Sequence, residues 1–308
     1  MVNLEIKIGA LKIKNPVLVV SGTFGYSGEE FEPFIDNAKI GAVISKTITL
    51  NPKDGNSPPR IQETDSGLIN SIGLQNPGLD LFVKKILPKV NKNSVFIVSI
   101  SGTTTKEFVD IVKVLDKHKK VSAIELNLSC PNIKYKDRMF SQSKSEVYHI
   151  VKSVKKTTNK PLIAKLTPNV TDICEIGQAC QDAGADAVSA INTILAMAID
   201  LKEKKPSIST VTGGLSGPAI KPVALRCVWQ LYNCVKIPII GMGGIMDAKD
   251  ALEFIVCGAS AVGIGTANFI DPKISVEISK GIVNYCKKNN IINISDLKGS
   301  LKTKSLTI

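Results

Sequence analysis

The sequence predicts a (β/α)8 TIM barrel, in which eight parallel strands, each followed by a helix, close into a cylinder. Apolar runs and helical patterns alternate along the chain, which favours parallel βαβ units. The runs number eight, have similar lengths and are not separated by a linker, which favours one domain over residues 1–308. With 44% hydrophobic but 5% aromatic residues, the core must consist mainly of Ile, Val, Leu and Ala, as in a buried parallel sheet.

Each predicted element follows from these patterns. Residues 4–13 alternate like a hairpin and are expected to close the bottom of the barrel. The predicted strands are residues 17–20, 42–45, 95–100, 123–128, 162–166, 187–191, 237–240 and 261–264. The clearest helical patterns cover residues 106–117, 172–183, 248–256 and 274–286.

Three connections, residues 51–69, 131–145 and 194–221, are longer than a barrel needs. Long loops in compact domains are usually functional or disordered. All three follow the C-terminal ends of strands, the face that carries the active site in barrel enzymes. We therefore expect the site at this face.

Composition excludes several classes of function. The net charge is +12 and the pI about 9.3, but the Lys residues are spread along the chain, so we expect no nucleic-acid partner. The seven Cys residues form no C-x-x-C pair, which predicts neither a metal site nor an iron–sulfur cluster in this chain. No signal peptide and no apolar stretch of about 18 residues is evident, so we expect a cytoplasmic protein without a membrane span.

Two glycine-rich segments follow the seventh and eighth predicted strands: GMGG at residues 241–244 and GIGT at residues 263–266. In a barrel, the loops after these strands commonly form a phosphate site, where glycine allows close approach of backbone N–H groups. A simple chain turn is the alternative for either loop alone. Their paired positions predict phosphate binding.

Two lysines occupy unusual places: Lys46 ends the second predicted strand, and Lys165 lies within the fifth. A desolvated ammonium group needs a partner. Either the lysines hold an anionic ligand or a reduced flavin, or their stems are buried while the charged ends reach solvent.

Polar residues gather at the same predicted face. Asn127 ends the fourth strand, Asn192 and Thr193 the sixth, and Asn70 lies in the first long connection. Together they would suit a planar, amide-rich ligand, although any one Asn also fits a turn or cap. Cys130, beside Asn127, is the potentially reactive side chain; it is either an acid–base group or a small buried hydrophobe.

The motifs resemble those of the class 1 dihydroorotate dehydrogenases, in the same order along nearly the whole chain. They are SGTFG (residues 21–25), SKT (45–47), INSIGLQNPG (69–78), NLSCPN (127–132), AKLTPN (164–169), INT (191–193), GMGG and GIGT. The LQNPG and SGTFG forms resemble the B type more than the fumarate-using A type. Cys130 is typical of class 1, because the membrane-bound class 2 enzymes have Ser there.

The resemblance implies FMN in the barrel mouth, with dihydroorotate stacked against it. The implied flavin contacts are Ser21, Lys46, Thr47, Ser99, Asn127, Lys165 and Ile191, and on the phosphate side Gly217, Gly243, Gly244, Gly265 and Thr266. The implied substrate contacts are Lys46, Asn70, Ser71, Ile72, Gly73, Leu74, Asn127, Asn192 and Thr193. Ser99 departs from the family pattern, which usually has Asn, so that contact is an open point.

The implied reaction removes a proton from C5 of dihydroorotate, with Cys130 as the base, and a hydride from C6, with FMN as the acceptor. The chain has no G-x-G-x-x-G opening a nicotinamide-binding unit. The B-type resemblance therefore implies a partner subunit with FAD and a [2Fe–2S] cluster that passes electrons to NAD, and a homodimer core within a heterotetramer. The alternatives are an A-type enzyme, a dihydropyrimidine dehydrogenase and a non-catalytic phosphate-binding barrel.

Overall fold

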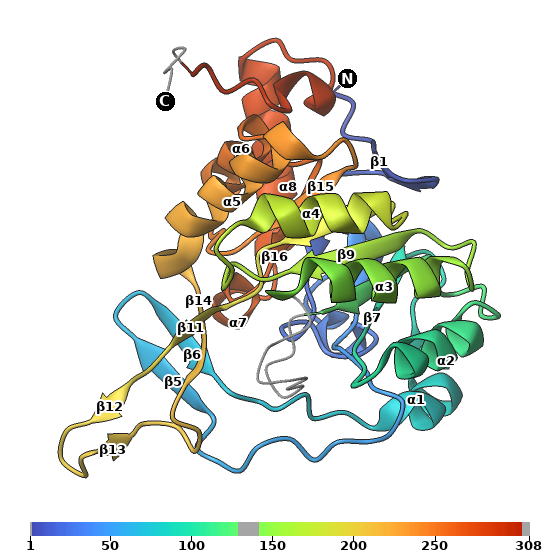
Figure 1. Ribbon diagram of the computed structural model, residues 1–308. Coiled ribbons are helices and arrows are strands. Elements are labelled where there is room, and N and C mark those ends of the chain that lie inside the picture. Colours follow the sequence, from blue (N-terminus) through green and yellow to red (C-terminus); the bar gives the residue numbers. More distant parts are fainter. Residues whose placement is uncertain (1, 129–141, 304–308) are drawn as a thin grey trace.

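The computed structural model describes residues 2–128 and 142–303, and its centre is a closed barrel of eight parallel strands (Figure 1). The strands follow one another around the barrel in the order β10-β15-β16-β3-β4-β7-β8-β9, which confirms the predicted fold. They are β3 (Val17–Val19), β4 (Ala42–Ile44), β7 (Phe96–Ile100), β8 (Ala123–Asn127), β9 (Leu162–Leu166), β10 (Ala187–Ala190), β15 (Ile239–Met242) and β16 (Ala261–Ile264).

The strands lie where the apolar runs predict them, except that β15 begins two residues later than expected. Pro238 explains the shift, because proline has no N–H to donate to a sheet ladder. Its carbonyl oxygen still accepts a hydrogen bond from Val188 N at 3.0 Å. The strand ends at Met242, directly before Gly243, which has a positive φ.

Helices cover the outside of the barrel. The longer ones are α2 (Thr105–Leu115), α3 (Lys144–Lys155), α4 (Ile173–Asp182), α5 (Lys221–Cys234), α6 (Ala248–Val256) and α8 (Ile274–Lys288), with one-turn helices α1 (Gly78–Leu81) and α7 (Ala267–Ile270). Side-chain caps fix several starts; Thr104 and Ser143 accept hydrogen bonds from the backbone of Glu107 and Glu146. Among the described residues, no helix has the length and apolar character required to cross a membrane.

The barrel interior is filled by layers of inward-facing side chains, to which alternate strands contribute. The strand register places four alanines in the lowest layer and four aliphatic residues above it. Polar residues begin in the third layer. From bottom to top, the layers are Ala42, Ala123, Ala187 and Ala261; Leu18, Ile97, Ile163 and Ile240; Ile44, Glu125, Ser189 and Gly263; and Val20, Ser99, Lys165 and Met242.

The N-terminal hairpin closes the bottom, as predicted. Strand β1 (Ile6–Ile8) pairs antiparallel with β2 (Leu11–Ile13) around a two-residue turn in which Gly9 takes a positive φ of 56°. Ile8 and Ile13 are fully buried and pack with the lower interior residues. The alanine layer leaves the room that these two side chains fill.

Two of the long connections form a sheet rather than irregular loops. Its order is β11-β14-β6-β5, from β11 (Ile194–Ala196), β14 (Gly213–Ser216), β6 (Gly67–Asn70) and β5 (Ile61–Thr64), and β12 (Ile199–Asp200) pairs with β13 (Lys205–Pro206) beyond it. This arm projects at the lower left of Figure 1, at the end of the barrel opposite the N-terminal hairpin. The third long connection, predicted at residues 131–145, lies mostly outside the described residues.

Candidate active site at the barrel mouth

Several of the predicted site residues form one hydrogen-bonded chain at the C-terminal ends of the barrel strands, the end opposite the N-terminal hairpin. The hydroxyl groups of Thr47 and Ser99 lie 3.0 Å apart. Asn127 Nδ2 donates to Thr47 Oγ1 at 3.3 Å, and Asn192 Nδ2 donates to Asn127 Oδ1 at 3.4 Å. The chain joins β7, β8 and the segments after β4 and β10, so it fixes four neighbouring parts of the mouth in one arrangement.

Lys165 projects from β9 into the top interior layer and is 6% exposed. Its Nζ donates to Ser21 Oγ, which follows β3, at 3.1 Å. The ammonium group therefore spans the barrel, between segments 144 positions apart in sequence. A cation held at this depth favours negative charge on a ligand above it.

Lys46 supplies a second cation, half-buried after β4. Its Nζ lies 5.3 Å from the centre of the Tyr26 ring. Burial, and then the nearby Arg60 guanidinium, lower the pKa of Lys46 below its ordinary value. Burial and Glu30 raise the pKa of Tyr26 to about 12, so its hydroxyl is neutral and donates to Gln75 O at 3.0 Å.

Arg60 is a site residue that the sequence analysis missed. Its Nη2 donates to Gln75 Oε1 at 2.7 Å, which connects it to the Tyr26–Lys46 cluster. Among the described residues, the mouth thus carries the cationic side chains of Lys46, Lys165 and Arg60. The sequence signal that could have indicated it is that Arg60 is the single Arg of the long connection at residues 51–69.

The glycine loops adopt backbone conformations and contacts that leave little room for a side chain at Gly244 and an open backbone at Gly265. Gly243 and Gly244 follow β15 with φ values of 122° and 78°. A Cβ on Gly244 would lie 2.8 Å from Lys221 N and 2.9 Å from Gly217 O, so the three predicted residues Gly217, Gly243 and Gly244 lie together. At Gly265, after β16, a Cβ would meet only Val20 Cγ2, at 3.4 Å, so the backbone there is open to a ligand.

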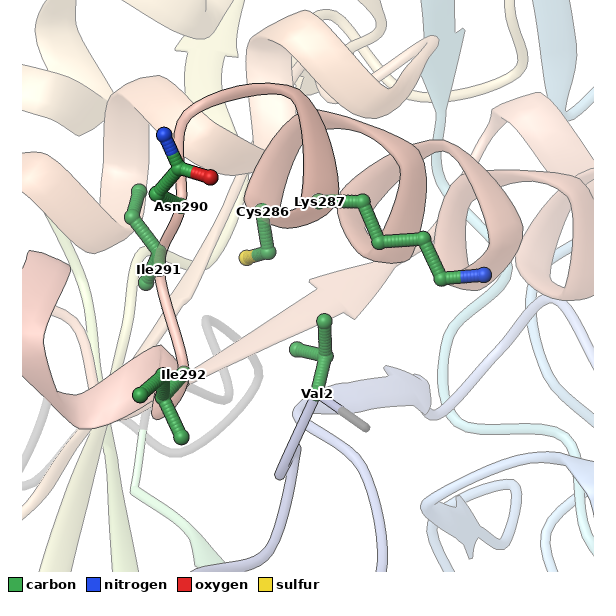
Figure 2. A pocket seen from close by; sticks show the side chains of 6 residues that line it. All are labelled: Val2, Cys286, Lys287, Asn290, Ile291 and Ile292. Atoms are coloured by element: carbon green, nitrogen blue, oxygen red, sulfur yellow. The ribbon is translucent and has the colours of Figure 1, made fainter.

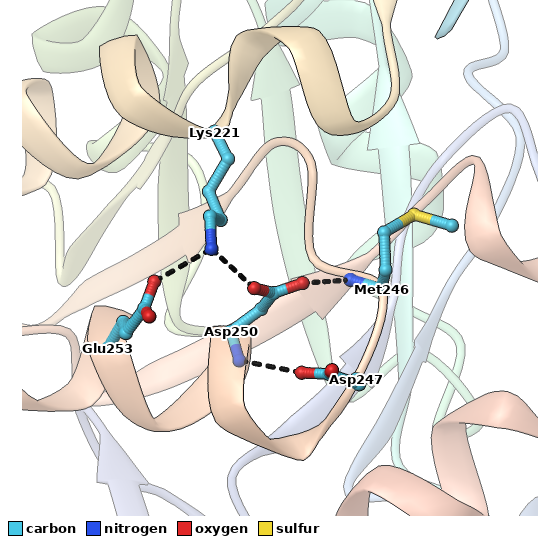
Figure 3. Close-up of polar contacts among 5 residues, drawn as sticks. All are labelled: Lys221, Met246, Asp247, Asp250 and Glu253. Carbon is cyan, nitrogen blue, oxygen red and sulfur yellow. Dashed lines mark hydrogen bonds and ion pairs between the residues drawn. The ribbon is translucent and has the colours of Figure 1, made fainter. Parts of the chain in front are cut away.

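Ion pairs join the start of α5 to α6, and a hydrogen bond ties the loop after β15 to α6 (Figure 3). Lys221, at the start of α5, contacts Asp250 Oδ1 at 2.5 Å and Glu253 Oε2 at 2.8 Å. The other oxygen of Asp250 accepts from Met246 N at 2.8 Å. The hydrogen bond to Asp250 is the main cause that raises the pKa of Lys221. On the far side of the phosphate region, Thr266 Oγ1 donates to Ser216 Oγ at 2.9 Å.

The predicted substrate segment, residues 70–74, runs from the arm towards the mouth. Asn70 Nδ2 donates to Gly214 O at 3.3 Å, and Ser71 Oγ accepts from Asn56 Nδ2 at 2.8 Å. Gly73 and Leu74 adopt positive φ values of 75° and 56°, which bend the chain sharply. The roles of Ile72, Gly73 and Leu74 towards a substrate stay predictions.

Two further predicted contacts flank the mouth. Ile191 is buried, and its N–H donates to Met242 O at 2.9 Å. The backbone N–H of Thr193 donates to Asn192 Oδ1 at 2.8 Å, and its carbonyl oxygen accepts from Asn169 Nδ2 at 3.0 Å. Cys130, the predicted base, lies outside the described residues.

A separate hollow lies beside the C-terminal end of α8 (Figure 2). Its described lining consists of Val2, Cys286, Lys287, Asn290, Ile291 and Ile292. This lining is mainly apolar and carries a single charge. The polar network and the cations at the mouth make the mouth the better candidate for chemistry.

Fold and site together indicate a class: a (β/α)8 barrel enzyme whose mouth has the cationic side chains and glycine loops suited to an anionic, phosphate-bearing ligand. Chemically, the donor set fits FMN, because glycine backbone is available for a phosphate, and amides, hydroxyls and an ammonium group lie at the same mouth.

Comparison with known proteins identifies the family. A profile of the dihydroorotate dehydrogenase family matches residues 3–285. A relative from Geobacter metallireducens is 50% identical over 301 residues, covering 97% of this chain and 98% of its own. A relative from Bacteroides thetaiotaomicron is 49% identical, over 98% of this chain and 100% of its own. A relative from Thermoanaerobacter pseudethanolicus is 50% identical, over 97% of this chain and 99% of its own. All three are named dihydroorotate dehydrogenase B (NAD(+)), catalytic subunit.

This chain belongs to the dihydroorotate dehydrogenase family. The family resemblance inferred from the motifs is therefore confirmed, and the B-type names of the relatives agree with the LQNPG and SGTFG forms.

Proposed function

We propose that this chain is the FMN-containing catalytic subunit of a B-type dihydroorotate dehydrogenase, which oxidises dihydroorotate to orotate in pyrimidine (UMP) biosynthesis. The observation that carries the proposal is the buried Lys165 ammonium group, held by Ser21 beneath a mouth lined with amides and glycine backbone. Family membership and the B-type names of the relatives support it.

The residues fall into two groups around the proposed flavin, one at its phosphate and one at its ring system. Backbone N–H groups near Gly243, Gly244 and Gly265 would bind the phosphate, with Thr266 as a further donor. Thr47, Ser99 and Asn127 would contact the ring system, with Lys165 supplying positive charge. When bound, FMN supplies a hydride acceptor.

Substrate would be bound and oriented by the other side of the mouth. Lys46, next to Arg60, would attract the substrate carboxylate, and Asn192 would hydrogen-bond its amide edge together with Asn70. Cys130 would remove the C5 proton. The thiolate is the form that acts as the base, so the pKa of the thiol must be low enough for it to ionise at the working pH. Lys165 would stabilise the negative charge of the reduced flavin.

Reoxidation requires a partner, in our proposal. The names of the relatives describe a catalytic subunit and NAD(+), so we propose a separate electron-transfer subunit. It would carry FAD and a [2Fe–2S] cluster, as the resemblance of the sequence motifs to the B type implies. A homodimer core in a cytoplasmic heterotetramer is the assembly we propose.

The test is to add dihydroorotate to the purified chain, with and without the co-expressed partner, and follow NAD reduction. We expect the isolated chain to bind FMN and reduce dyes, but to reduce NAD only when the partner is present. Strong NAD reduction by the chain alone would contradict the partner requirement. Strong activity with fumarate would indicate the A type, and preference for dihydrouracil would indicate a dihydropyrimidine dehydrogenase.

A further inference from the structure

A carboxylate lies inside the barrel, below the proposed flavin site, and the mechanism above does not use it. Glu125 occupies the middle inward position of β8 and is 0% exposed. It shares the third interior layer with Ile44, Ser189 and Gly263. Ser189 Oγ donates to Glu125 Oε2 at 3.0 Å.

The second carboxylate oxygen, Oε1, has no hydrogen-bond partner among the described residues. A buried carboxyl group with one of its two oxygens unsatisfied is unfavourable unless another interaction compensates it. Ile44 and Gly263 offer no polar side chain in the same layer. The compensation must therefore come from outside that layer.

Lys165 is the nearest source of opposite charge in the interior. It lies in the layer directly above, on the neighbouring strand β9, where Glu125 pairs with Ile163 and Asn127 pairs with Lys165. Ser189, the hydrogen-bond donor to Glu125, is itself the register partner of Lys165 on β10. Glu125 is thus connected to the lysine in two ways: through the neighbouring strand β9, and through the Ser189 hydroxyl on β10.

The charges of the barrel interior can be counted. All inward positions of the eight strands lie in the described part of the chain, and they hold one acidic residue, Glu125, and one basic residue, Lys165. The two charges cancel within the interior; without Glu125, one positive charge would remain there.

We propose that Glu125 is a positioning residue that acts through Lys165: its carboxylate is the buried counter-charge of that ammonium group and limits the positive potential under the flavin. It touches neither substrate nor flavin. Two-electron reduction adds negative charge to the flavin, so this counter-charge selectively opposes tight binding of the reduced form. The inference rests on the proposed FMN site.

The first test uses the chain without flavin. Thermal unfolding is measured for Glu125→Gln, Lys165→Gln and the double variant; Gln keeps the size of Glu and still accepts from Ser189. We expect the double variant to lose fewer degrees in Tm than the sum of the two single losses, because both charges are removed together. Additive losses would overturn the pairing. If Glu125→Gln alone does not fold, rescue by Lys165→Gln supports the pairing, and failure of the double variant contradicts it.

The second test measures the dissociation constants of oxidised and reduced FMN. For Glu125→Gln we expect the ratio of the oxidised to the reduced constant to rise about tenfold, equivalent to a midpoint potential about 30 mV more positive. Asp80→Asn, which removes a charge from an exposed helix, should leave the ratio unchanged.

A merely structural role for Glu125 would weaken binding of both flavin forms equally, and an unchanged ratio in Glu125→Gln would overturn the inference. Failure of the wild-type chain to bind FMN at all would instead contradict the proposed function. The two failures are therefore distinguishable.

Discussion

The lower and upper halves of the barrel interior are built from the same strands but have opposite chemistry. The lower two layers contain only Ala, Leu and Ile and are sealed by Ile8 and Ile13 of the N-terminal hairpin. The upper layers and the mouth contain Ser99, Lys165 and Asn127, which are buried. Ser99 and Asn127 both hydrogen-bond to Thr47, and Lys165 donates to Ser21.

The difference shows how the fold separates two tasks. Dry aliphatic layers stabilise the barrel through burial and close packing. Buried polar groups cost free energy unless they are satisfied, so a polar upper half is retained for binding and catalysis. Changes to residues that would contact the ligand should therefore alter chemistry with little loss of stability, and changes in the two lower layers should do the reverse.

The largest effect is expected for Cys130→Ala, which removes the proposed base. Loss of a general base typically slows the affected step by about 10² to 10⁴-fold. Flavin reduction by dihydroorotate, followed by stopped-flow absorbance, should slow by that factor while FMN content stays normal. Cys130→Ser should recover part of the rate, mainly at high pH, because a hydroxyl ionises less readily than a thiol. A wild-type rate in the Ala variant would refute the role.

Glycine variants separate ligand contact from backbone strain. Gly265→Val has open space on the protein side, so it should leave the Tm of the flavin-free chain nearly unchanged. It should weaken FMN binding by about tenfold to a hundredfold, the value of one or two hydrogen bonds to a charged group. Gly244→Val has a φ of 78° and contacts Lys221 too closely, so it should lower both FMN affinity and Tm. An unchanged FMN dissociation constant in Gly265→Val would contradict the proposed phosphate site.

The lower half is tested by Ile163→Ala, in the aliphatic layer. Ile163 is fully buried, so the cavity should cost about 2–5 kcal/mol in the free energy of unfolding. Urea unfolding measures this loss, and FMN titration of the folded variant should give a wild-type dissociation constant. An Ile163→Ala variant with normal stability but weakened flavin binding would contradict the division of tasks between the two halves.

The smallest effect is expected at the rim, for Arg60→Gln. Lys46 must be protonated to attract a carboxylate, so KM for dihydroorotate should rise as pH increases through the lowered pKa of Lys46. Removing Arg60 relieves part of that lowering, and the rise in KM should move to higher pH. At neutral pH the change in KM should stay below about tenfold, because partly exposed charges contribute little. Lys84→Gln, on an exposed helix, is the control; a shift to lower pH would contradict the assignment.

Sequence predicted most of the barrel because its signals are local. Apolar runs mark the strands, and the glycines after β15 and β16 mark the phosphate region. The arm could not be predicted from such signals, since β6 pairs with β14, about 145 residues away, and short strands have no distinctive pattern. Glu125 and Arg60 were missed for a related reason. A single charged residue in a strand or loop acquires meaning only when neighbouring strands place it beside Lys165 or Lys46.

The central claim is that this barrel mouth oxidises dihydroorotate with its own flavin. The most direct measurement is anaerobic addition of dihydroorotate to the purified chain, while the absorbance of bound FMN is recorded. The account predicts rapid bleaching of the flavin band, one equivalent of orotate per FMN, and slower bleaching in Cys130→Ala. A chain whose flavin is bleached by dithionite but not by dihydroorotate would contradict it.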